Sequence, residues 1–89
     1  MRVLLAEDEP DLNRIITKKL TSEGYSVDSC TDGEGAIDCL LCAEYDAVIL
    51  DIMMPKADGF EVLRRLRGAG KETPVLFLTA RDALSLIHI

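Results

Sequence analysis

The chain has 89 residues, 48% of them hydrophobic, which suits one small domain with a modest core. Its formal net charge of −6 at pH 7 argues against direct nucleic-acid binding, because such binding needs a basic face. No apolar run reaches the ~18 residues of a membrane span. The apolar N-terminus meets Glu7-Asp8-Glu9 without a cleavage region, so we expect a cytoplasmic protein with no membrane contact.

The first part of the chain predicts a strand followed by a helix. Residues 2–6 form an apolar run typical of a buried strand. Pro10 and Asp11 suit the first turn of a helix, because proline needs no hydrogen-bond donor there and an acid matches the helix dipole. Apolar residues then recur at helical spacing as far as Leu20, and Gly24 ends the helix.

The alternation of strand and helix continues along the chain. Residues 25–30 alternate apolar and polar, as a half-buried edge strand does, and apolar spacing marks a second helix after residue 33. Residues 47–50 are all apolar and predict a strand buried on both faces. Asp58-Gly59 opens a third helix, and residues 75–79 form a fourth strand after Pro74.

This order of elements predicts an α/β domain with a mostly parallel sheet and helices on both faces. The links are short and no internal linker appears, so residues 1–89 are expected to form a single domain. Neither G-x-G-x-x-G nor G-x-x-x-x-G-K-[ST] is present, which argues against a dinucleotide-binding or P-loop enzyme.

Polar side chains stand where three of the strands end: Glu7 and Asp8 after the first, Asp51 after the third and Thr79 after the fourth. If the first and third strands are neighbours, their three carboxylates converge and repel one another unless a cation intervenes. Hard oxygen ligands of this kind suit Mg²⁺. Asp51 is then either a metal ligand or a nucleophile that forms an aspartyl-phosphate, and Thr79 is placed to donate a hydrogen bond to phosphoryl oxygens.

Each of these residues also has a simpler interpretation. An acidic pair after a strand is often a solvated loop or the start of a helix, Asp51 alone could be a turn residue, and Thr79 alone could cap the next segment. Their occurrence together, in this order and at strand ends, is what favours a site.

As a set, these segments resemble the receiver domain of two-component response regulators. The similar segments are residues 3–10, 48–55, 58–59 and 74–81, and the style is most similar to receivers that carry a winged-helix DNA-binding domain. The resemblance implies a flavodoxin-like sheet in which Asp51 accepts the phosphoryl group. It also implies that Glu7 and Asp8 bind Mg²⁺ together with Asp51 and the backbone carbonyl of Met53, and that Thr79 senses the phosphoryl group.

The C-terminal part departs from this family. Receivers continue through a fourth helix, a fifth strand carrying a lysine and a fifth helix, whereas residues 83–89 form an atypical apolar tail. Lys56 and Lys71 stand at the wrong places to replace that lysine. We therefore expect a three-layer open parallel sheet of order 2-1-3-4 that lacks the fifth strand and the last helix and leaves the fourth strand as an exposed edge.

The tail itself has two interpretations. It is a frayed or partial helix on a truncated or artificial end, or its apolar residues cover exposed core, either within the chain or across a swapped dimer. The residues concerned are Leu84, Leu86, Ile87 and Ile89.

Three functions are compatible with these patterns. The first is a phospho-accepting signalling domain, not an enzyme, that takes a phosphoryl group from a sensor histidine kinase onto Asp51 in the presence of Mg²⁺. The second is a receiver fragment that is impaired in phosphorylation and self-associates through the exposed fourth-strand edge and the tail. The third is a Mg²⁺-dependent phosphatase with Asp51 as nucleophile, against which Met53 counts because such enzymes commonly carry a second acid at that position.

Overall fold

The computed structural model describes the backbone of residues 1–52, 54, 56–80 and 85–88, and the side chains of these residues as far as position 78. Strands and helices alternate through most of the chain, as the sequence pattern predicts. The elements are β1 (Arg2–Ala6), α1 (Pro10–Ser22), β2 (Ser26–Cys30), α2 (Gly33–Cys42), β3 (Ala47–Asp51), α3 (Gly59–Gly68), β4 (Val75–Ala80) and β5 (Ser85–His88).

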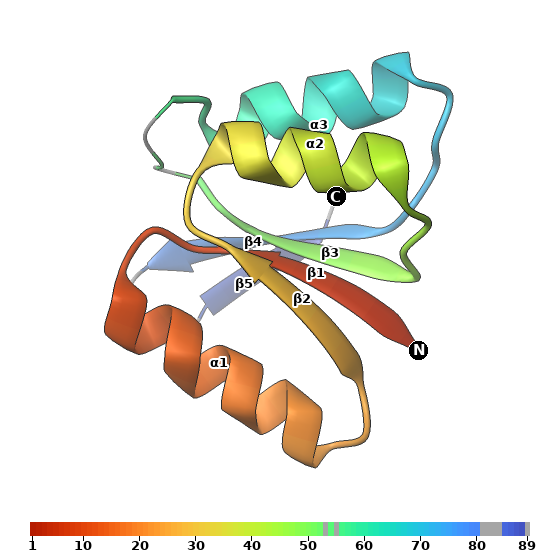
Figure 1. The fold of residues 1–89 in the computed structure, drawn as a ribbon. Helices are drawn as coiled ribbons and strands as arrows, with labels where there is room; N and C mark the ends of the chain where they lie inside the picture. The colour runs from red at the N-terminus through yellow and green to blue at the C-terminus, as the bar shows by residue number, and fades with distance from the viewer. Residues whose placement is uncertain (53, 55, 81–84, 89) are drawn as a thin grey trace.

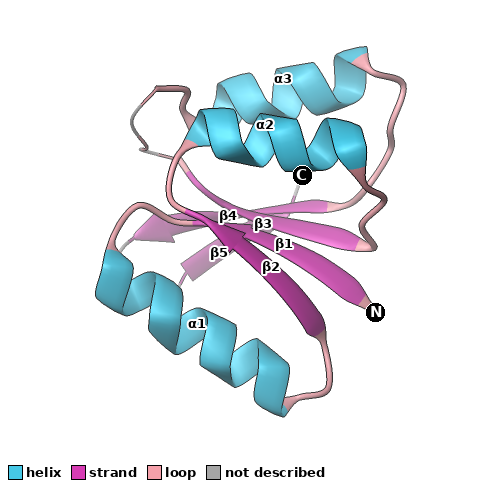
Figure 2. Ribbon diagram, viewed as in Figure 1, coloured by secondary structure: helices cyan, strands magenta, loops and turns pink. Residues whose placement is uncertain are grey.

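The strands form one sheet in the order β2-β1-β3-β4-β5, with β1, β3 and β4 inside it (Figure 1). The first four strands are parallel, which confirms the predicted order 2-1-3-4. Helix α1 covers one face of the sheet, and α2 and α3 cover the other (Figure 2). The result is the three-layer α/β architecture expected from the sequence.

The C-terminal segment corrects two expectations. The fold does not lack a fifth strand and β4 is not an exposed edge, because Ser85–His88 forms β5 and pairs with β4. The strand is antiparallel: Phe77 pairs with Ile87, and Leu78 with Leu86. The antiparallel direction of β5 follows from the short connection between β4 and β5. The four residues 81–84 are too few for the helical crossover that a parallel pair requires.

A frayed or partial helix at residues 85–88 is therefore also wrong. Without β5, the edge of β4 would present unpaired N–H and C=O groups. The backbone of residues 85–88 pairs with this edge of the same chain. That the apolar side chains of the tail cover exposed core stays a prediction, because these side chains lie outside the described residues. Within the described part of the chain the helices are α1, α2 and α3.

The main core lies between the sheet and the α2–α3 layer. Alternate residues of the inner strands point into it, as the period of a strand requires, and meet the apolar faces of the two helices. Its fully buried members include Leu4, Ala6, Val48, Leu50, Val75 and Phe77 from the sheet, and Ala36, Val62 and Leu66 from the helices.

A close backbone contact joins the loop after β3 to the start of α2. A Cβ atom placed on Gly33 would lie 1.9 Å from the carbonyl oxygen of Ala57, so only glycine permits this approach. Helix α2 begins beside it with Asp32, whose side chain accepts a hydrogen bond from the Gly35 N–H at 2.8 Å. The contact fixes the loop that leaves the carboxyl end of β3.

Candidate functional site

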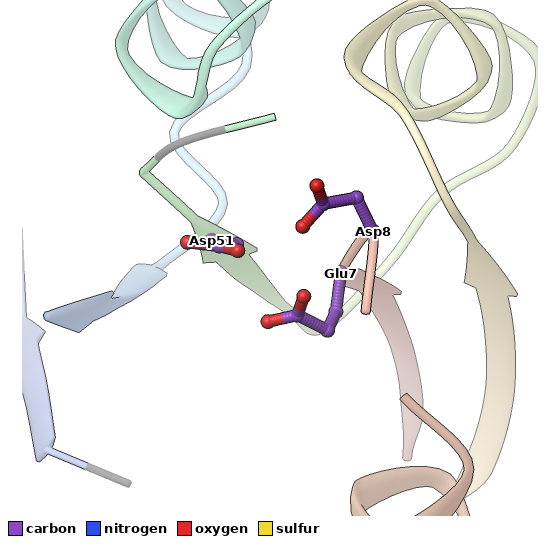
Figure 3. A group of neighbouring side chains, drawn as sticks. All are labelled: Glu7, Asp8 and Asp51. Atoms are coloured by element: carbon purple, nitrogen blue, oxygen red, sulfur yellow. The ribbon is translucent and has the colours of Figure 1, made fainter. Parts of the chain in front are cut away.

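The carboxyl ends of β1 and β3 lie side by side, because Ala6 is in register with Leu50. Glu7 and Asp8 leave β1 at this rim, and Asp51 is the last residue of β3. Each of the three offers one carboxylate oxygen, and these oxygens lie within 4.8 Å of one another (Figure 3). The predicted convergence of acids from distant parts of the chain is therefore present.

The cluster is enclosed by protein. Glu7 and Asp51 are 0% and 2% exposed, and Asp8 is half-buried. Burial raises the pKa of Glu7 to about 7, and the nearby Asp8 and Asp51 add to this rise. The N–H of Glu9 opposes it by donating a hydrogen bond to Glu7 Oε2 at 2.7 Å. Crowding of the three acids therefore disfavours the ionised form of Glu7 in the absence of a cation.

The donor set fits a hard divalent cation. Mg²⁺ takes oxygen ligands, keeps several waters, and is typically held by one or two carboxylates together with phosphate oxygens. A cation between the acids would also relieve their mutual repulsion. The arrangement can thus hold a metal ion beside the side chain of Asp51 and bring an anionic phosphoryl group to it.

Asn13, in α1, contacts the main chain beside the acidic cluster, a contact not predicted from the sequence. Its side-chain amide donates to the carbonyl oxygens of Glu7 at 2.9 Å and of Cys30 at 3.0 Å, and the side chain is almost fully buried. The sequence does mark Asn13 as unusual, because it shares helical spacing with Ile16 and Leu20 and is thus a polar residue within an apolar stripe. A buried polar residue of this kind needs hydrogen-bond partners.

Two predicted site residues are only partly covered by the structure. The backbone of Thr79 lies in β4, directly after Leu78, which is in register with Asp51. The chain thus carries Thr79 to the same rim, but its side chain lies outside the described residues. Met53 lies outside them altogether, so its role as a carbonyl ligand stays a prediction.

Lys56 and Lys71 have partners away from the acidic cluster. Lys56 Nζ lies 3.7 Å from Asp32 Oδ2. Lys71 Nζ donates to the carbonyl oxygen of Leu40 at 2.7 Å and lies 3.2 Å from Glu44 Oε1. Neither interaction involves the acidic cluster.

The sheet order and the acidic rim define a flavodoxin-like α/β domain with a site at the carboxyl ends of its central strands. Residues 3–88 match the response regulator receiver domain family, and the chain belongs to this family. It is accordingly a phosphoacceptor domain of two-component signalling.

Curated relatives agree with this assignment. The chain is 47% identical over 85 residues to the transcriptional regulatory protein TcrA of Mycobacterium tuberculosis, a match that covers 96% of this chain and 34% of TcrA. It is 48% identical over 82 residues to the transcriptional regulatory protein DltR of Streptococcus agalactiae, which covers 92% of this chain and 37% of DltR. The chain thus spans only about a third of the length of these relatives.

A solved structure shares the fold. The receiver domain of the sensor histidine kinase PA1611 from Pseudomonas aeruginosa, solved with magnesium coordinated in its active-site cleft, superposes with a TM-score of 0.83 at 32% identity. The match covers 92% of this chain and 69% of that one. Among the described residues, no helix is both long and apolar enough to cross a membrane.

Proposed function

We propose that this chain accepts a phosphoryl group on Asp51 from a sensor histidine kinase, with Mg²⁺ held by Glu7, Asp8 and Asp51. The observation that carries the proposal is the convergence of these three carboxylates within 4.8 Å at the carboxyl ends of β1 and β3. The magnesium ion in the cleft of the Pseudomonas receiver domain supports the choice of metal.

In the proposed reaction, a carboxylate oxygen of Asp51 attacks the phosphorus of a phosphohistidine. The new oxygen–phosphorus bond forms as the nitrogen–phosphorus bond breaks, and the electron pair leaves with the imidazole. Bound Mg²⁺ would supply charge that offsets the repulsion between the carboxylate and the phosphoryl group. Glu7 and Asp8 would hold the metal, the Met53 carbonyl would complete its protein ligands, and the Thr79 hydroxyl would donate to a phosphoryl oxygen.

The partners of the whole protein belong to this proposal as well. TcrA and DltR are transcriptional regulatory proteins of which this chain spans about a third, and they support a role for the chain as the receiver of a transcription regulator. Any contact with DNA would then fall to a part of the protein outside residues 1–89, because this segment is acidic.

Self-association is a second, separate proposal. Its place is the free edge of β5 and not β4, which is paired on both sides. Residues 85–88 carry no Asp, Glu, Lys or Arg, and edges without charge pair readily with another chain. Light scattering would show a dimer for residues 1–89, and a monomer would refute the proposal.

The phosphoryl transfer is tested with a small phosphodonor such as acetyl phosphate and Mg²⁺. Intact mass should show the addition of one phosphoryl group, and Asp51→Asn should abolish it. Asp58→Asn is the matched control, because Asp58 caps α3 through Glu61 N–H at 2.9 Å and asparagine caps equally well. Absence of labelling in the wild type would favour an impaired fragment, and turnover of phosphate monoesters lost in Asp51→Asn would favour a phosphatase.

A further inference from the structure

The turn that carries Glu7 and Asp8 has to direct two consecutive side chains toward the same place. Consecutive residues of a strand point to opposite faces of the sheet, yet the carboxylates of Glu7 and Asp8 both lie beside Asp51 (Figure 3). The chain therefore has to leave strand geometry at the peptide that joins Glu7 to Asp8. Whatever fixes the plane of that peptide also fixes the direction of both side chains.

Asn13 holds this peptide from α1. The carbonyl group of the Glu7–Asp8 peptide accepts a hydrogen bond from Asn13 Nδ2 at 2.9 Å, in a buried position. The same amide group donates to the Cys30 carbonyl at 3.0 Å, which also accepts the Glu7 N–H at 3.1 Å. The side chain of Asn13 thus continues the hydrogen bonding between β1 and β2 one step beyond the last strand pair, Ala6 and Cys30.

The amide is itself held in place. Asn13 Oδ1 accepts a hydrogen bond from Thr17 Oγ1 at 3.3 Å, one turn further along α1. This contact assigns the oxygen to the helix side and the nitrogen to the two carbonyl groups. Only 8% of Asn13 is exposed, so water cannot easily replace the donors if the amide is removed.

We propose that Asn13 is a positioning residue of the acidic site, whose side-chain amide fixes the Glu7–Asp8 peptide and so directs both carboxylates toward Asp51. Asn13 touches neither the metal nor the phosphoryl group and acts through the main chain of Glu7. Partners of this kind, which orient metal ligands, typically change metal affinity by 10- to 100-fold when removed.

The test compares Asn13→Leu, which keeps the approximate volume without the amide, with Tyr45→Phe. The control removes a part-buried hydrogen bond of 2.7 Å between Tyr45 and Asp28, which lies away from the rim, so it lowers stability without touching the acidic site. In the metal-free chain, amide hydrogen exchange at Glu9 should accelerate about tenfold in Asn13→Leu, because Glu9 N–H depends on the position of the Glu7 carboxylate. Tyr45→Phe should leave the exchange rate at Glu9 unchanged relative to the amides of α3.

Mg²⁺ affinity is the second measurement and rests on the proposed function. NMR titration with MgCl₂ should show binding weakened about tenfold in Asn13→Leu and unchanged in Tyr45→Phe. If Asn13→Leu fails to fold, Asn13→Ser, which is too short to reach both carbonyl groups, replaces it. Wild-type exchange at Glu9 and wild-type affinity in a folded variant would overturn the inference. A wild type that binds no Mg²⁺ would instead refute the proposed function, and the metal-free exchange would still decide on Asn13.

Discussion

Lys71 Nζ lies 2.7 Å from the main-chain oxygen of Leu40, so a lysine from the segment between α3 and β4 caps the C-terminal end of α2. It also lies 3.4 Å from the carbonyl oxygen of Ala43. The last carbonyl groups of a helix have no partners within it and carry the negative end of the helix dipole, which suits an ammonium group. The contact ties the two helices of one layer together away from the acidic rim.

Replacing this lysine with methionine should lower the free energy of unfolding by about 1–2 kcal/mol, because a half-buried charged donor is lost and two carbonyl groups are left without it. Urea unfolding followed by circular dichroism measures the change. Lys19→Met is the control, since Lys19 makes an exposed ion pair with Glu23 and should cost less than about 0.5 kcal/mol. Equal losses in the two variants would contradict the capping role.

The pH dependence of stability should follow Glu7. Its pKa is raised by burial from 4.5 to about 7 in the folded chain, so the folded state binds more protons than the unfolded state between these values. Stability is then fully present below pH 4.5 and falls as pH rises toward 7, by about 1–3 kcal/mol in the metal-free chain. Thermal unfolding in EDTA at several pH values measures this.

Glu7→Gln should remove most of that dependence, since glutamine carries no titrating proton. Asp28 does not interfere, because its pKa is lowered from 3.8 by the hydrogen bonds from Tyr45 and Arg2 and it titrates below the window. Addition of Mg²⁺ at neutral pH should raise the melting temperature of the wild type and leave that of Asp51→Asn unchanged. A flat wild-type profile between pH 4.5 and 7 would show that Glu7 titrates normally.

Lys56 occupies a left-handed backbone conformation, with φ of 71°, in the loop after β3. This conformation costs residues other than glycine or asparagine roughly 1 kcal/mol of folding free energy. The ion pair between Lys56 and Asp32 at 3.7 Å is partly exposed and contributes little to stability. Lys56→Gly and Lys56→Asn should therefore leave the melting temperature nearly unchanged or slightly higher. Lys56→Val should destabilise the chain by more than about 1 kcal/mol, because a branched side chain tolerates this conformation poorly. Equal melting temperatures for all three variants would refute the argument.

Local pattern accounts for most of what the sequence predicted. The start of α1 at Pro10 and the cap of α3 at Asp58 depend on neighbouring residues alone, and both are confirmed. The meeting of Asp8 with Asp51 depended on one further rule, that carboxyl ends of neighbouring parallel strands share an edge, and the geometry agrees.

The features that were missed depend on distant contacts. The formation of β5 depends on the edge that β4 offers, and its antiparallel direction depends on the short connection between the two strands. Neither can be read from the composition of residues 85–88. Asn13 acts on carbonyl groups 6 and 17 residues away, so its spacing could mark it as unusual but could not name its partners. The extent of the domain and the role of Thr79 stay predictions.

The contact between Gly33 and Ala57 links the stability of α2 to the loop beside the acidic rim. Gly33→Ala would place a Cβ atom 1.9 Å from the Ala57 carbonyl oxygen, and both are backbone positions that cannot rotate away. We expect a loss of more than about 2 kcal/mol in the free energy of unfolding, as for other overpacked sites, and slower labelling of the folded variant by acetyl phosphate.

Gly35→Ala is the matched control, two residues further along the same helix. Its nearest contacts would be at 3.4 Å, to Asp32 Oδ1 and Cys30 Cβ, which is ordinary packing. Alanine is also the better helix former by about 1 kcal/mol, so this variant should be as stable as the wild type or more stable, with labelling unchanged. If Gly33→Ala were as stable as Gly35→Ala, the close contact between Gly33 and Ala57 would not hold the loop after β3. The strands alone would then position the acidic rim.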